Sequence, residues 1–166
     1  MTAPNVREVG IVNVSFGDNV TVVQPANLYG CSIGDDVFVG PFTEIQKGVT
    51  IGARTRVQSH SFICELVAIG EDCFVGHGVM FTNDVFADGG PARGNKDLWR
   101  ATNIGNRVSI GSNATLLPVS ICDDVIIGAG AVVTHDIKLA GIYAGNPARL
   151  LRSMTPEPVA HQRLPQ

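Results

Sequence analysis

An apolar residue recurs at every sixth position of this chain, and this period constrains the fold more than any other feature. Nine consecutive positions of one phase are all apolar: Ile33, Val39, Ile45, Ile51, Val57, Ile63, Ile69, Val75 and Phe81. At an apolar content of 45%, a run of this length would arise by chance about once in a thousand trials. Neither the period of about 3.6 residues of an amphipathic helix nor the alternation of an ordinary strand produces a phase of six.

The same phase continues on both sides of this run. It extends over residues 16–133, and the step is five residues instead of six at Leu28–Ile33 and Leu116–Ile121. Three short strands of six residues each close a triangular coil of about 18 residues, and such coils stack at a spacing of about 4.8 Å. The pattern therefore predicts an all-β fold, a single-stranded parallel β-helix of about six coils, with a shortened turn at each five-residue step.

Residues 84–103 interrupt the repeats with a polar, glycine-rich stretch that contains the only tryptophan, Trp99. This composition is unsuited to a core, and we expect a loop that protrudes from one corner of the β-helix. The chain then divides into a lead-in at residues 1–15, the β-helix at residues 16–145 and a C-terminal segment at residues 146–166.

The C-terminal segment no longer follows the six-residue pattern. Pro147 is well placed to begin a helix, because proline suits the first helical position. We therefore expect a short helix through Arg149 and Leu150, followed by a loose tail.

Composition and charge exclude several classes of function. The net charge of −3 and the isoelectric point near 5.7 give no long-range attraction for nucleic acid or for an anionic membrane. The start of the chain has no apolar signal core, and no stretch is apolar over the length of a membrane span, so we expect a cytoplasmic protein. The four cysteines form no C-x-x-C pair, and no metal site is expected from the spacing of the histidines, His60, His77, His135 and His161.

The repeats, together with IGSNATLLPVSICDDVIIGAGAVVT and GIYAGNPARLLR, resemble the hexapeptide-repeat acyltransferases from Phe16 to Arg152. The segment QSHSFICELVAIGEDCFVGHGVMFTND and the GGPARGNKDLW loop are similar to sugar N-acetyltransferases that act on the 3-amino group of a UDP-linked 2-acetamido-3-amino-glucuronate. The resemblance implies a left-handed β-helix, a homotrimer, and acetyl-CoA bound in the groove between subunits. It also implies a role in the biosynthesis of surface polysaccharide, such as lipopolysaccharide.

The stacking of coils suggests where the chemistry takes place. Residues 18 positions apart share a face, which places Lys47, Glu65 and Asn83 in one column. Acetyl transfer to an amine needs a neutral nucleophile held in line with the thioester, and an amide or carboxylate suffices to orient it. Asn83 is therefore the first candidate and Glu65 the second, although an ordinary surface charge ladder would have the same spacing. His77 and His60 are alternative general bases, the role that histidine has in related O-acyltransferases.

The remaining candidates would bind the two substrates. For the sugar nucleotide we expect Gln58, His60, Asp84, Arg93 and Lys96, with Arg100 as a further loop cation. Small corner residues would let pantetheine lie close to the coils, and the resemblance places the CoA phosphates near the basic residues that follow: Gly111, Ser112, Gly128, Ala129, Pro147, Arg149 and Arg152. A flexible loop and an ordinary basic chain end are the simpler explanations of these cations.

Three alternatives to the UDP-glucuronate assignment remain open at this level. One is a dTDP-linked 3-amino-deoxyhexose as the acceptor, and another is a sugar O-acetyltransferase with His77 as the base. The third is a β-helical scaffold without catalytic activity.

Overall fold

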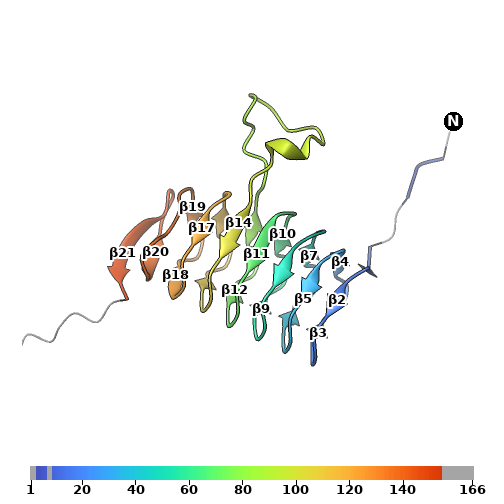
Figure 1. The fold of residues 1–166 in the computed structure, drawn as a ribbon, viewed down its shortest axis with the longest axis horizontal. Helices are drawn as coiled ribbons and strands as arrows, with labels where there is room; N and C mark the ends of the chain where they lie inside the picture. Colours follow the sequence, from blue (N-terminus) through green and yellow to red (C-terminus); the bar gives the residue numbers. More distant parts are fainter. Residues whose placement is uncertain (1–2, 7–8, 155–166) are drawn as a thin grey trace, which may run out of the picture.

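The computed structural model describes residues 3–6 and 9–154. The chain winds into a parallel β-helix whose short strands form three sheets, here called faces A, B and C (Figure 1). The strands of face A are β1 (Ile11–Val12), β4 (Asn27–Tyr29), β7 (Glu44–Ile45), β10 (Phe62–Ile63), β13 (Met80–Phe81), β16 (Thr115–Leu116) and β19 (Val132–Val133).

The other two faces repeat the same arrangement. Face B consists of β2 (Ser15–Phe16), β5 (Ser32–Ile33), β8 (Thr50–Ile51), β11 (Val67–Ile69), β14 (Thr102–Ile104) and β17 (Ser120–Ile121). Face C consists of β3 (Thr21–Val22), β6 (Phe38–Val39), β9 (Arg56–Val57), β12 (Phe74–Val75), β15 (Ser109–Ile110), β18 (Val125–Ile127), β20 (Gly141–Ala144) and β21 (Arg149–Ser153).

The predicted left-handed parallel β-helix is thus confirmed. The coils number about seven rather than six, because β1, which lies in the segment that was expected to be a lead-in, already pairs with β4. The nine apolar positions from Ile33 to Phe81 all point inward and are at most 4% exposed. Leu28 and Ile33 are both buried although only five residues separate them, and the chain turns between them at Gly30, whose φ is +59°.

The predicted short helix at Pro147 is wrong. Residues 149–153 form β21, which pairs antiparallel with β20, and Pro147 lies in the turn between these two strands. The amide of Ala148 donates to the carbonyl of Val132, so the turn is tied to the preceding coil instead of starting a helix. This hairpin gives partners to the backbone groups at the edge of β20, which would otherwise be open. The tail expected at residues 155–166 lies outside the described residues.

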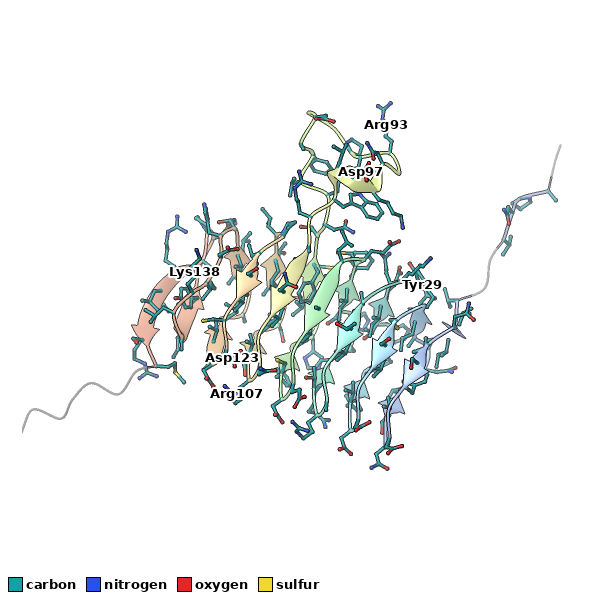
Figure 2. All side chains as sticks on the ribbon, viewed as in Figure 1. Tyr29, Arg93, Asp97, Arg107, Asp123 and Lys138 are labelled. Carbon is teal, nitrogen blue, oxygen red and sulfur yellow. The ribbon has the colours of Figure 1, made fainter. Side chains whose placement is uncertain are left out.

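Two ion pairs stack at the corner between faces B and C. Arg54 Nε lies 2.7 Å from Asp72 Oδ1, and Arg107 Nε lies 2.7 Å from Asp124 Oδ1; Figure 2 labels Arg107 at this corner. The hydrogen bond from Arg54 holds the pKa of Asp72 below its usual range, and that from Arg107 does the same for Asp124.

These shifts predict how stability depends on pH. A carboxyl whose pKa is lower in the folded than in the unfolded state stabilises the fold above the unfolded value of about 3.9, and this stabilisation is lost as the pH falls through the folded pKa. Arg107→Gln should therefore lose stability at pH 7 and show a flatter decline below pH ~4 than the unmodified protein. Urea unfolding measured across this range tests this, with Lys138→Gln as the charge-matched control; an unchanged acid profile of Arg107→Gln would contradict it.

Candidate functional site

The loop between β13 and β14 protrudes from the β-helix, as predicted, and carries the short 3₁₀ helix η1 (Lys96–Leu98) (Figure 1). Its base is organised by Asp84. The Oδ1 atom of Asp84 accepts from the amide of Phe86 at 2.9 Å, and Oδ2 accepts from the amide of Ala92 at 2.7 Å. Asp84 also forms an antiparallel bridge with Trp99. The carboxylate that was predicted to bind substrate thus holds the two arms of the loop together.

Removing this carboxylate should loosen the loop. In Asp84→Ala the amides of Phe86 and Ala92 lose their acceptors, and we expect tryptic cleavage after the loop cations to become at least about tenfold faster, the equivalent of 1.4 kcal/mol. Limited proteolysis followed by mass spectrometry measures this rate. Asp88→Ala, an exposed loop position, is the control, and equal cleavage rates of the two variants would show that Asp84 does not order the loop.

The expected column of Lys47, Glu65 and Asn83 is present. Ile45 pairs with Ile63 and Phe62 with Met80, which brings the residues after these strands into register. Asn83 Nδ2 donates to the backbone carbonyl of Glu65 at 3.1 Å. The predicted stacking of Asn83 on Glu65 is therefore confirmed, while their chemical roles remain predictions.

The loop folds back onto this column. Lys96 Nζ lies 2.5 Å from Glu65 Oε2 and 5.1 Å from the centre of the Trp99 ring. The side chain of Glu65 is 21% exposed, less than half of the 57% of Lys96, so the ion pair sits at the junction between loop and β-helix. Glu65 and Lys96, predicted for different roles, therefore form one contact.

A hollow of about 390 Å³ lies between the loop and face A. This volume falls at the lower end of the range of about 300–1,000 Å³ that is usual for small-molecule sites. Its lining combines aromatic rings with a few polar groups: Gln46, Phe62, Cys64, Phe81, Thr82, Asn83, Asp84, Phe86 and Trp99.

A polar network on face A, which the repeats did not predict, leads to this hollow. Tyr29 and Gln46 both donate to Glu44 Oε1, at 3.0 and 2.9 Å, and Gln46 Oε1 accepts from the amide of Glu65 at 3.2 Å. Burial, together with the hydrogen bond to Glu44, raises the pKa of Tyr29 to about 12. The pairing of β4 with β7 brings Tyr29 beside Gln46, and the 17-residue spacing of the two in the sequence was the available signal.

The two candidate histidines lie at the other edge of face A, at its corner with face C. His60 stacks on Phe42 with ring centres 4.9 Å apart, and the amide of His77 donates to Ser112 Oγ at 3.2 Å. Both histidines are exposed. Strand β13 separates His77 from Asn83, so within one chain the structure brings neither histidine to the Glu65–Asn83 column. Gln58 precedes the same corner and is half-buried, and its backbone carbonyl accepts from Thr43.

The small residues predicted to line the CoA site continue the corner on which His77 lies. The backbone amide of Asn113 donates to the carbonyl of His77, and that of Gly130 donates to the carbonyl of Ser112, so successive coils stack directly at this corner. A Cβ on Gly111 would lie 2.4 Å from the backbone nitrogen of Ala129, so glycine is required there by the close approach of the coils. Gly128 occupies the equivalent corner position of the next coil.

The predicted cations have different surroundings. Arg149 and Arg152 lie exposed on β21, and Arg149 Nη1 donates to the carbonyl of Ala148. In the loop, Arg100 donates to the carbonyls of Asp97 and Trp99, whereas Arg93 is exposed near the tip (Figure 2).

Residues 3–6 and 9–154 contain no cluster of three or more His, Cys, Asp or Glu side chains that could hold a metal ion. No helix in the same part of the chain is long and apolar enough to cross a membrane.

Comparison with known proteins supports the repeat pattern. The family described as bacterial transferase hexapeptide (six repeats) matches residues 30–65, and the hexapeptide repeat of succinyl-transferase matches residues 102–135. The bifunctional protein GlmU of Clostridium beijerinckii is 34% identical over 134 residues, which cover 77% of this chain and 26% of that protein. The bifunctional protein GlmU of Streptococcus uberis is 31% identical over 140 residues, 83% of this chain and 28% of that protein. The chain thus spans about a third or less of these curated relatives.

Solved structures share the fold. A variant of AntD, an N-acyltransferase from Bacillus cereus in complex with dTDP and coenzyme A, matches with a TM-score of 0.74 at 22% identity, covering 84% of this chain and 83% of that one. A galactoside acetyltransferase in complex with coenzyme A matches with a TM-score of 0.63 at 28% identity, covering 73% and 64% of the two chains. With its six-residue repeats, its β-helix and these matches, the chain belongs to the hexapeptide-repeat family of bacterial transferases.

Proposed function

We propose that the protein is an acetyl-CoA-dependent N-acetyltransferase that acts on an amino group of a nucleotide-linked sugar. The observation that carries this proposal is the Asn83 side chain at the rim of the aromatic hollow, fixed by its hydrogen bond to the carbonyl of Glu65. Its Nδ2 is used in that bond, so Oδ1 is the atom that would accept from the attacking amine. The ligands of the structural relative AntD, dTDP and coenzyme A, support the same chemistry.

The reaction that we propose needs only orientation and a leaving group. The neutral amine attacks the thioester carbonyl and forms a C–N bond, which produces a tetrahedral oxyanion and a positively charged nitrogen. Collapse of this intermediate breaks the C–S bond, and the departing CoA thiolate takes the proton from nitrogen. Asn83 orients the amine because its Oδ1 accepts from the N–H of the amine, and Glu65 keeps the loop in place through Lys96.

The corner of Ser112 and Ala129 would hold pantetheine, and Pro147, Arg149 and Arg152 lie towards the end where the CoA phosphates would bind. This corner and the Asn83 column lie at opposite edges of face A. A homotrimer with acetyl-CoA in the groove between subunits would bring the corner of one subunit to the hollow of the next, and we propose this assembly. We also propose that the enzyme acts in the cytoplasm on a precursor of surface polysaccharide.

Two acceptors fit this chemistry. The sequence resemblance favours the 3-amino group of a UDP-linked 3-amino-glucuronate, and the alternative is a dTDP-linked 3-amino-deoxyhexose. Incubating the protein with acetyl-CoA and each amino sugar nucleotide, and following the free thiol, tests the proposal. Release of thiol together with an N-acetylated product is expected; protection by CoA against thermal unfolding without acetylation of any amino sugar nucleotide would overturn it.

A second candidate is a sugar O-acetyltransferase with His77 as the general base. The observation that favours it is the exposed position of His77 on the same corner as Ser112 and Ala129. An O-acetyltransferase should acetylate a sugar that has a hydroxyl in place of the amine, whereas the proposed N-acetyltransferase should not.

A further inference from the structure

The lining of the hollow differs from that of a site for an anionic sugar. Four of its nine residues are aromatic, namely Phe62, Phe81, Phe86 and Trp99. Its one charged residue is Asp84, and no lysine or arginine lines the hollow in the described part of the chain. A carboxylate placed there would lose water next to aromatic rings and a second carboxylate, which is unfavourable without a paired cation.

The nearby loop cations are already engaged or distant. Lys96 pairs with Glu65 at 2.5 Å, so its charge is neutralised at the junction of loop and β-helix. Arg100 directs Nη1 towards the carbonyls of Asp97 and Trp99, both at 3.1 Å. Arg93 lies near the tip of the loop (Figure 2). An anionic group in the hollow would therefore have to share Lys96 with Glu65 or displace Glu65 to gain a partner.

An amino sugar without a carboxylate has complementary properties. The C–H face of a pyranose ring packs against aromatic rings and buries apolar surface there. The amine arrives as an ammonium group, which the Asp84 carboxylate and the faces of Trp99 and Phe86 attract. After the ammonium group releases a proton to water, the neutral amine can donate an N–H to the amide oxygen of Asn83, which lines the same hollow.

We propose that the acceptor is an amino sugar without a carboxylate, such as a deoxyhexose, and that the hollow between Phe86, Trp99 and Asn83 selects it over a uronic acid. This inference rests on the proposed function and names the substrate class of the same site. It reverses the preference for the glucuronate that the sequence resemblance indicated, because a uronate needs a cation that the described residues of one chain do not provide in the lining of the hollow.

The experiment uses Trp99 as its probe. It is the only tryptophan of the chain, so the intrinsic fluorescence of the full-length protein reports on the hollow. Two nucleotide-linked 3-amino sugars with the same nucleotide, one with a methyl group and one with a carboxylate at C6, are titrated without acetyl-CoA. We expect the sugar with the C6 methyl group to bind at least about tenfold more tightly; equal affinities, or tighter binding of the uronate, would overturn the inference.

A charge introduced into the hollow provides the matched test. Phe86 is 59% exposed, so Phe86→Arg adds a cation without disturbing the core, and we expect the affinity ratio of the two sugars to fall at least tenfold (~1.4 kcal/mol). Phe16→Arg, 42% exposed on β2 in the first coil, is the control and should leave the ratio unchanged. A ratio that responds to neither substitution contradicts selection by the hollow.

Acetylation of the two sugars is measured separately with acetyl-CoA. Selective binding without acetylation would overturn the proposed function and leave the selectivity of the hollow standing. Acetylation of both sugars with equal kcat/KM would support the proposed function and overturn the inference.

Discussion

Replacing Asn83 with alanine should lower kcat/KM for the amino sugar by about 100-fold, the effect expected when a reacting group is displaced by about 1 Å. The side chain is held by its bond to the carbonyl of Glu65 at 3.1 Å, so its free oxygen has a defined position at the rim of the hollow. Its loss leaves the amine without a fixed orientation but leaves the core unchanged. Steady-state kinetics with saturating acetyl-CoA measure this effect.

Two further variants complete the comparison. Asn103→Ala changes an exposed asparagine on face B and should leave kcat/KM within about twofold. Surface substitutions away from binding sites and specific contacts change the free energy of unfolding by about 0.5 kcal/mol or less. His77→Ala should have a smaller effect than Asn83→Ala if an amine is the acceptor. The opposite ranking would identify His77 as the base and favour O-acetylation.

The largest expected effect on stability is that of Phe81→Ala. Phe81 is 1% exposed and stacks above Ile63 and below Leu116 inside the β-helix. Truncating a buried phenylalanine to alanine costs about 3–5 kcal/mol, because apolar contacts are lost and a cavity remains. The free energy of unfolding, measured with urea at one fixed protein concentration, should fall by this amount.

Phe16→Ala is the matched control. Phe16 lies on β2 in the first coil and is 42% exposed, so its truncation removes less buried surface and should cost less than about 1 kcal/mol. Equal losses for the two variants would show that burial in the coil interior does not determine the contribution of a residue to stability.

Much of the fold could be predicted because the six-residue period repeats in every coil. Each apolar position has the same surroundings as its neighbours one coil away, so the pattern alone identifies the inward residues, and those from Ile33 to Phe81 are all buried. The stacking of Asn83 on Glu65 follows from the same period, because three six-residue steps separate the two residues. The prediction failed at Pro147, where the repeats end: the choice between helix and strand was decided there by the open edge of β20, which no local pattern reveals.

The sequence by itself determined the β-helix, the protruding loop and the column to which Glu65 and Asn83 belong, because these depend on spacing along a periodic chain. Only the tertiary structure decided which groups meet at the site. Lys96 reaches Glu65 across 31 residues, and Asp84 closes the base of the loop. Such contacts depend on the path of an irregular segment, whose conformation is set by a few specific hydrogen bonds and ion pairs rather than by a repeated apolar pattern. For that reason the charge of the residues that line the hollow could be determined only from the folded chain.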